Sequence, residues 1–140
     1  AVRFEIERLA ISGEINVNDM PEMWNDLMDR YLGIKPKKHS EGVLQDIHWS
    51  QGSVGYFPTY TLGTIIAAQL RDAMEKDLGS LYNYISTPNL APIREWLRIK
   101  IHRWGSTYAP KELLKRSLGI DIDPTSYLSY LEKKYITKTL

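Results

Sequence analysis

The sequence predicts an all-α protein, and two observations support that class. Apolar residues recur at helical spacing along most of the 140 residues, and prolines and glycines stand where helices are expected to begin and end. The charged and apolar fractions, 25% and 43%, are those of an ordinary globular protein of a size that can bury one core. We therefore expect residues 1–140 to form a single helical region.

Two helices are expected in the first quarter of the chain. A helical pattern starts at Val2, without a preceding Met or cap, and Ser12-Gly13 closes it. We interpret this abrupt start as the middle of a longer chain. A second helix begins near Asn18-Asp19, whose side chains can cap it, and ends at Gly33. Residues 13–17 are the one stretch for which we predict a short strand.

Five further helices are expected after an aperiodic segment that covers residues 42–57. They begin near residues 58, 80, 92, 110 and 124, and prolines mark four of these starts. The longest runs to residue 78. Its buried face is expected to consist of Leu62, Ile65, Ile66, Gln69, Leu70 and Ala73.

Composition excludes several classes of protein. Eighteen basic and seventeen acidic residues give a net charge of +1, which lacks the basic excess of a nucleic-acid-binding protein. The chain has no cysteine, so disulfides, thiolate metal sites and cysteine nucleophiles are excluded. No apolar stretch approaches the length that crosses a bilayer. We expect a cytoplasmic protein without nucleic-acid or membrane partners.

Residues that can carry chemistry are concentrated between positions 42 and 60. The segment Gly42-Val43-Leu44-Gln45-Asp46-Ile47-His48-Trp49 is followed by Gly55-Tyr56-Phe57-Pro58-Thr59-Tyr60. Imidazoles and phenols can donate hydrogen bonds to charge on a reacting carbonyl oxygen, and a carboxylate can orient an imidazole. Composition alone favours a structural role, because aromatic and hydrogen-bonded polar residues are common in cores.

The order of these residues resembles a signature of the carboxypeptidase Taq family of metallocarboxypeptidases, which is written G-x-x-Q-D-x-H-W. The chain matches every fixed position, with Gly42, Gln45, Asp46, His48 and Trp49. The likeness also includes residues 3–7, 55–60, 101–105 and 130–135, so that it covers nearly the whole chain.

The resemblance implies the C-terminal part of a longer, mostly helical enzyme that removes residues from peptide C-termini. Such enzymes bind zinc or cobalt through H-E-x-x-H and a later Glu. This chain has only His39, His48 and His102, none of them paired at i, i+4, so we expect no metal ligand and no cofactor in it. The implied partners are the peptide substrate, the upstream part of the same enzyme and, since the family often dimerises, a second copy.

The resemblance also implies roles for individual residues. The expected catalytic donors are His48, Tyr56 and Tyr60, and the expected substrate-binding or positioning residues are Gln45, Asp46 and Trp49. Packing of the two phenols in a core is the structural alternative. For Arg3 the resemblance offers a position facing the cleft, but we favour a surface ion pair with Glu7 at i+4.

Two functions from different classes follow. The first is a portion of a metal-dependent carboxypeptidase that contributes a substrate and transition-state wall of the cleft and is inactive alone. The alternative is a free-standing helical binding module that kept the motif without catalysis. A reading frame that continues upstream through H-E-x-x-H would distinguish the first from the second.

Overall fold

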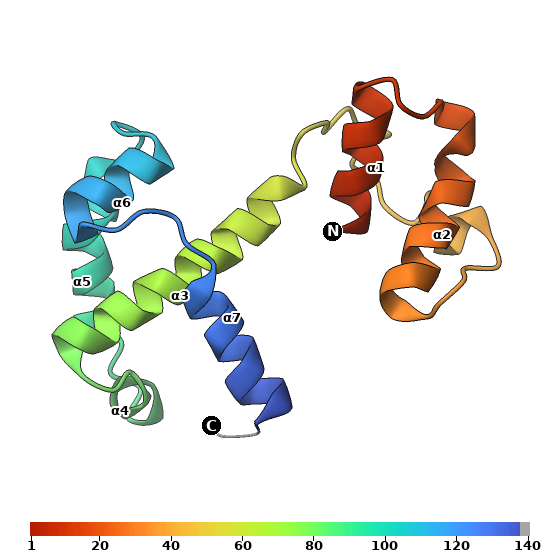
Figure 1. The fold of residues 1–140 in the computed structure, drawn as a ribbon. Coiled ribbons are helices and arrows are strands. Elements are labelled where there is room, and N and C mark those ends of the chain that lie inside the picture. Colours follow the sequence, from red (N-terminus) through yellow and green to blue (C-terminus); the bar gives the residue numbers. More distant parts are fainter. Residues whose placement is uncertain (138–140) are drawn as a thin grey trace. The chain divides into compact units, whose positions relative to one another are not determined.

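The computed structural model describes residues 1–137, which form helices and connecting loops without any strand (Figure 1). The all-α prediction is therefore confirmed for these residues. The chain divides into two compact units, residues 1–61 and the residues from 62 onward. Each unit has a hydrophobic core of its own.

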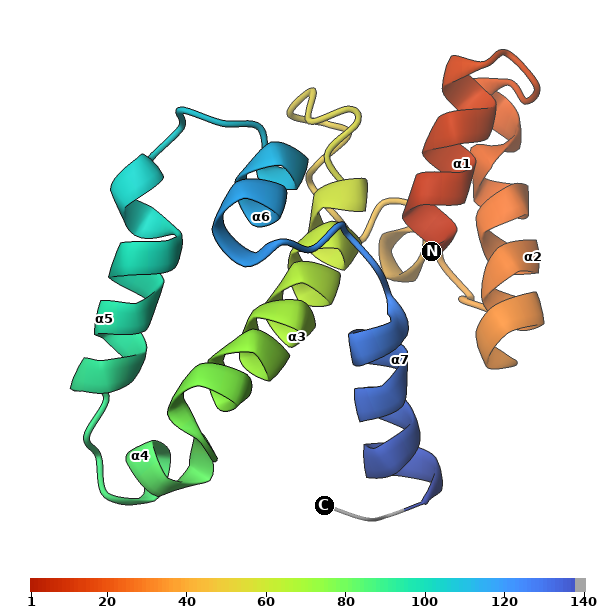
Figure 2. The ribbon, with the colours of Figure 1, turned by 60° about the vertical axis from the view of Figure 1, so that its left-hand side comes forward.

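Two antiparallel helices, α1 (Val2–Ile11) and α2 (Met20–Leu32), lie side by side in unit 1 (Figures 1 and 2). A turn and a short 3-10 helix, η1 (Val17–Asp19), connect them, so the strand predicted over residues 13–17 is wrong. The Asn16 backbone N–H donates to the Asp19 carboxylate over 3.2 Å. Local hydrogen bonds of this kind satisfy the polar backbone groups of the connection, so it needs no partner in a sheet.

The core of unit 1 joins both helices to the aperiodic segment. It consists of Ile6 from α1, Trp24 and Leu27 from α2, and Val43, which follows the 3-10 helix η2 (His39–Glu41). Trp24 is only 1% exposed. Because Val43 enters this core, the segment after α2 is anchored although it forms no long helix.

Gly42 is required where this segment meets Trp24. A Cβ atom at position 42 would lie 3.2 Å from Trp24 Cδ1 and 3.4 Å from Pro36 Cβ. Trp24 is too tightly packed to move aside, so only the residue without a side chain fits there without displacement.

The five later helices form close to their predicted positions. The longest, α3 (Pro58–Leu78), begins within unit 1 and contributes most of its length to unit 2. The others are α4 (Tyr82–Ser86), α5 (Ala91–Lys100) with η3 (His102–Trp104), α6 (Pro110–Leu118), and α7 (Thr125–Leu131), which η4 (Glu132–Ile136) extends as a π-helix. Figure 2 shows α5 returning antiparallel to α3.

The core of unit 2 is centred on Met74, Leu81 and Trp96. Along α3 this core begins at Leu70, and Leu62, about two turns earlier, is 43% exposed. The prediction that Leu62 belongs to the buried face is therefore wrong for this chain. Gln69 is buried as predicted.

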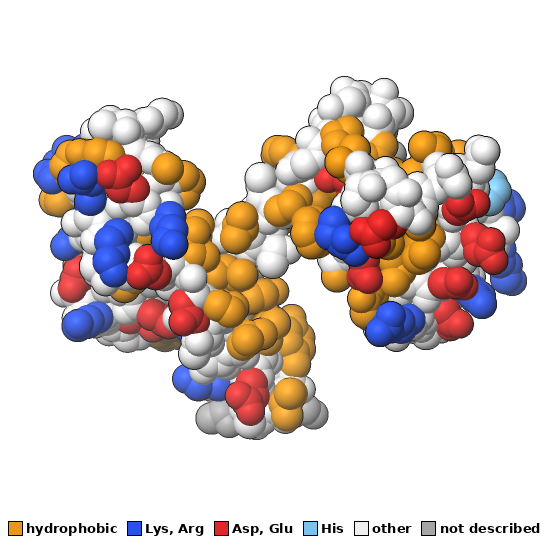
Figure 3. Space-filling view, turned by 45° about the horizontal axis from the view of Figure 1, so that its top comes forward, with side chains coloured by type: hydrophobic (Ala, Val, Ile, Leu, Met, Phe, Trp, Pro, Cys, Tyr) orange, Lys and Arg blue, Asp and Glu red, His pale blue; other side chains and the backbone are white. Residues whose placement is uncertain are grey.

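Charged side chains of both signs are interspersed on the face that Figure 3 shows, which agrees with the near-zero net charge. None of the helices within residues 1–137 combines the length and the apolar character needed to cross a membrane.

Two glycine substitutions should change stability in opposite directions. We expect Gly42→Ala to lower the free energy of unfolding of unit 1 by about 1–3 kcal/mol, since the new methyl group overpacks Trp24. Gly63→Ala, inside α3 with open space around its Cβ, should raise stability by about 0.5–1 kcal/mol. Urea unfolding followed by tryptophan fluorescence and circular dichroism checks both. A neutral Gly42→Ala would show that Trp24 gives way.

Candidate functional site

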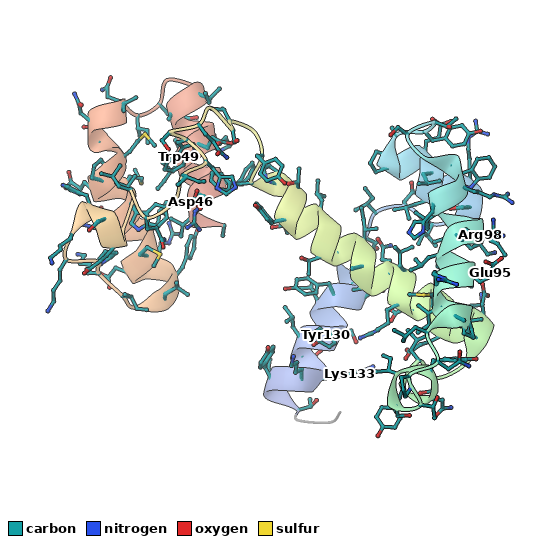
Figure 4. The ribbon with its side chains drawn as sticks, turned by 180° about the vertical axis from the view of Figure 1, so that it is seen from behind. Asp46, Trp49, Glu95, Arg98, Tyr130 and Lys133 are labelled. Atoms are coloured by element: carbon teal, nitrogen blue, oxygen red, sulfur yellow. The ribbon has the colours of Figure 1, made fainter. Side chains whose placement is uncertain are left out.

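Asp46, His48 and Tyr60 form a hydrogen-bonded chain in unit 1. The Oδ1 atom of Asp46 contacts His48 twice, accepting from its backbone N–H over 2.8 Å and hydrogen bonding to its Nδ1 atom. On the other side of the ring, His48 Nε2 lies 3.1 Å from the Tyr60 hydroxyl oxygen. Figure 4 shows Asp46 on the segment that joins α2 to α3. The predicted orientation of an imidazole by Asp46 is therefore present in the structure.

Aromatic rings surround the His48 imidazole. Tyr56 stacks on it with centroids 5.6 Å apart and an interplanar angle of 21°, and Phe57 lies 5.1 Å away. Tyr60 meets both His48 and Tyr56 edge-on. Tyr56 is 47% and Tyr60 54% exposed, so neither phenol is a buried core residue of this chain.

Local sequence explains why these rings converge. Gly55 adopts φ = 79°, a left-handed conformation that glycine tolerates best, and this turn leads directly into Tyr56. Pro58 then begins α3, and the Thr59 backbone N–H and hydroxyl both donate to the Tyr56 carbonyl, over 3.0 and 2.6 Å. Tyr60 consequently lies in the first turn of α3, opposite His48.

The charges of the site favour an ionised Asp46 and a neutral Tyr60. The His48 backbone N–H, followed by the His48 side chain, lowers the pKa of Asp46, and the Arg3 guanidinium adds to this effect. Partial desolvation raises the pKa of Tyr60, and the Tyr56 phenol and the Asp46 charge act in the same direction. At neutral pH the carboxylate therefore only accepts hydrogen bonds, whereas the Tyr60 phenol retains its proton.

Arg3 belongs to the site, whereas sequence reasoning favoured a surface ion pair over a position at the cleft. Its Nε atom lies 3.1 Å from Asp46 Oδ2, and its guanidinium lies over the rings of Trp24 and Phe57 at 5.2 and 5.7 Å from their centroids. The predicted ion pair between Arg3 and Glu7 is wrong, because each side chain finds its partner on the aperiodic segment.

Glu7 is the second residue that sequence reasoning missed. It is only 6% exposed, and its carboxylate accepts the Trp49 Nε1–H over 2.8 Å and the Gly55 backbone N–H over 2.7 Å. A charged residue bordering the apolar stripe of α1 was the only available signal. Glu7 thus fastens both the end of the signature and the turn before Tyr56.

The remaining predicted residues occupy different positions. Trp49, labelled in Figure 4, packs edge-on against Trp24 and Phe57 with centroids 6.5 and 5.7 Å away. Gln45 is exposed, and its backbone N–H donates to the Gly42 carbonyl over 3.1 Å. The structure therefore brings Asp46, His48, Tyr56 and Tyr60 into one cluster, which Trp49 supports.

An apolar pocket of about 360 Å³ also lies in unit 1. Trp49 and Glu7 line it together with aliphatic residues of α1, α2 and the loops: Ala10, Ile11, Val17, Met20, Pro21, Val43, Leu44 and Val54. Its lining includes exposed aliphatic side chains, notably Ile11 at 72% and Leu44 at 71% exposure.

The side chains present do not fit a metal ion. Among residues 1–137, no group of three or more His, Asp or Glu residues is arranged to hold one. Both ring nitrogens of His48 already face protein partners, Asp46 and Tyr60. Catalytic zinc typically needs three protein ligands, and this cluster does not supply them.

The substitution Glu7→Gln should lower the free energy of unfolding by about 1–3 kcal/mol, because the amide group turns a donor toward one of the two partly buried N–H groups. Urea unfolding followed by tryptophan fluorescence measures it. The matched control Glu41→Gln, at an exposed position, should stay within about 0.5 kcal/mol of the wild type. Equal stability of the two variants would contradict the anchoring role of Glu7.

Comparison with known proteins gives a consistent result. The family model described as carboxypeptidase Taq (M32) metallopeptidase matches residues 1–135. Thermostable carboxypeptidase 1 of Pyrococcus furiosus is 53% identical over 135 residues, which are 96% of this chain and 27% of that protein. Thermostable carboxypeptidase 1 of Thermus thermophilus is 41% identical over 134 residues, 96% of this chain and 26% of that protein.

Solved structures agree with this match. The chain superimposes on a Pyrococcus furiosus carboxypeptidase with a TM-score of 0.92 at 52% identity, covering 96% of this chain and 27% of that one. For Trypanosoma cruzi metallocarboxypeptidase 1 the TM-score is 0.91 at 39% identity, covering 96% and 28%. The chain thus spans 27% of the length of the first of these structures. Because the family model covers nearly all of it, this chain belongs to the carboxypeptidase Taq (M32) metallopeptidase family.

Proposed function

We propose that this chain is the C-terminal portion of a metal-dependent carboxypeptidase that removes residues from peptide C-termini. In this proposal, residues 42–60 form one wall of the cleft, and the rest of the enzyme and the peptide are the partners. The observation that carries it is the cluster of Asp46, His48, Tyr56 and Tyr60, in which an oriented imidazole meets two exposed phenols.

The cluster suits the stabilisation of negative charge on a substrate. Hydrolysis of a peptide bond places charge on the carbonyl oxygen, and donors that are already oriented stabilise that charge most. The Tyr56 and Tyr60 hydroxyls are such donors. His48 engages one nitrogen with Asp46, so that Nε2 is the nitrogen that faces the Tyr60 phenol.

Gln45, Asp46 and Trp49 are assigned to positioning and substrate contact. Asp46 acts through His48, and Trp49 acts through its packing against Phe57 and its bond to Glu7. The exposed amide of Gln45 is available to a peptide backbone.

The metal, zinc or cobalt, would be held by residues outside this chain. It would supply the electrophilic activation that metallopeptidases require. On this proposal the isolated chain does not hydrolyse peptides, and the intact enzyme is cytoplasmic.

Removing a donor should slow turnover without unfolding the enzyme. In the full-length protein, His48→Ala and at least one of Tyr56→Phe and Tyr60→Phe should lower kcat by about 10²–10³-fold, since each removes an interaction that strengthens as charge develops. Steady-state kinetics with an unblocked peptide, and with a C-terminally blocked peptide for comparison, measure the change in kcat. Metal analysis and thermal melts of each variant accompany the kinetics.

The control for these variants is Tyr82→Phe, which alters a phenol that is 73% exposed in unit 2 and should leave kcat unchanged. A purely structural cluster gives another pattern, in which the melting temperature falls while the folded fraction turns over normally. Normal kcat in all three cluster variants would refute the assignment.

The isolated chain should bind zinc with a dissociation constant no tighter than about 1 μM, because residues 1–137 contain no set of three ligands. Calorimetric titration of the metal-free chain with zinc tests this expectation. A one-to-one site in the nanomolar range would mean that the chain holds the metal itself.

A further inference from the structure

The hydrogen bonds around His48 determine which ring nitrogen carries a proton. Asp46 is ionised at neutral pH, so its Oδ1 atom accepts and cannot donate. The Nδ1 atom that contacts Oδ1 must therefore bear the proton. In a neutral ring Nε2 is then a bare acceptor, and the Tyr60 hydroxyl 3.1 Å away is a group that can donate to it.

We propose that Arg3 and Asp46 are positioning residues that hold His48 in its Nδ1–H tautomer and thereby aim the Nε2 lone pair at Tyr60. This inference concerns residues of this chain alone. Its test does not depend on the function proposed above.

Arg3 and His48 contact different oxygens of the Asp46 carboxylate. The Arg3 Nε atom lies 3.1 Å from Oδ2 in an ion pair that is not a hydrogen bond, whereas Oδ1 faces the backbone N–H and Nδ1 of His48. The guanidinium itself is confined by the Trp24 and Phe57 rings on which it lies. The carboxylate is thus held from one side by α1 and from the other by its own loop, and it cannot turn without breaking one of these contacts.

The arrangement makes the His48–Tyr60 hydrogen bond reversible in direction. When water supplies a proton to Nε2, the ring becomes the donor and the Tyr60 oxygen becomes the acceptor. Tyr60 keeps its own proton and directs it to another acceptor, either the Tyr56 phenol oxygen or a carboxylate or carbonyl oxygen of a peptide. The charged and titratable groups around His48 are Arg3 from α1, Asp46 and Tyr56 from the loop, and Tyr60 from α3. Glu7 is not among them, because its carboxylate binds Trp49 and Gly55.

Nitrogen NMR of the ¹⁵N-labelled chain tests the tautomer directly. Two-bond proton–nitrogen correlations distinguish a protonated from a bare ring nitrogen. Above the titration of the imidazoles, we expect His48 to show a protonated Nδ1 and a bare Nε2. His39 and His102, which are exposed, are internal controls that should show the opposite tautomer of free histidine. A neutral His48 with its proton on Nε2 would overturn the proposal without any substitution.

Variants separate positioning from mere packing. Asp46→Ala should return His48 to the pattern of His39, because it removes the oxygen that accepts from Nδ1. Arg3→Gln should do so in part, with recovery in Arg3→Lys because the charge is restored. Tyr60→Phe should leave the neutral tautomer unchanged, since Asp46 sets it. When the His48 ring carries a proton on both nitrogens, the wild type should show an Nε2–H signal that exchanges slowly with water. The Tyr60→Phe variant should lose this slow exchange. An unaltered tautomer in Asp46→Ala, with circular dichroism equal to wild type, would also overturn the proposal.

Discussion

The buried carboxylate of Glu7 is the constraint on which the candidate site depends. It accepts two hydrogen bonds from a segment more than 40 residues away in sequence, one from Trp49 and one from the turn at Gly55. A buried carboxylate without donors is costly, and so are buried donors without an acceptor, so each requires the other. This mutual requirement fixes an otherwise aperiodic segment against α1.

Helix α1 holds that segment at two points one turn apart. Arg3 binds the Asp46 side of the loop, and Glu7 binds the Trp49 and Gly55 side. Because residues at i and i+4 share a helix face, a single helix can set the positions of both parts. Unit 2 uses a comparable device in Gln69, whose amide donates to the Asp121 carbonyl and accepts the Asp123 backbone N–H. In both units one side chain on a helix orders a loop that has no regular structure of its own.

Rigidity and exposure are combined in the cluster around His48. The backbone beneath it is anchored by Val43 and Trp49 in the unit 1 core, whereas the phenols of Tyr56 and Tyr60 remain accessible. Donors that are oriented before a ligand arrives lose little free energy in reorganising, which is the property that electrostatic stabilisation of a transition state needs.

The sequence by itself determined the helices, the family resemblance and the concentration of chemistry between Gly42 and Tyr60. These follow from local causes, namely apolar periodicity, prolines at helix starts and the order of residues in the signature. The partners of Arg3 and Glu7 were decided only by the tertiary structure. Spacing within α1 favoured an ion pair between them, but in the fold each of these two side chains meets a partner on the distant aperiodic segment instead. The contact between Asp46 and His48 is local, so the sequence could suggest it, whereas the approach of Arg3 and Tyr60 to this pair required the fold. For the same reason the exposure of Leu62 depends on which elements pack together, and helical periodicity carries no information about that.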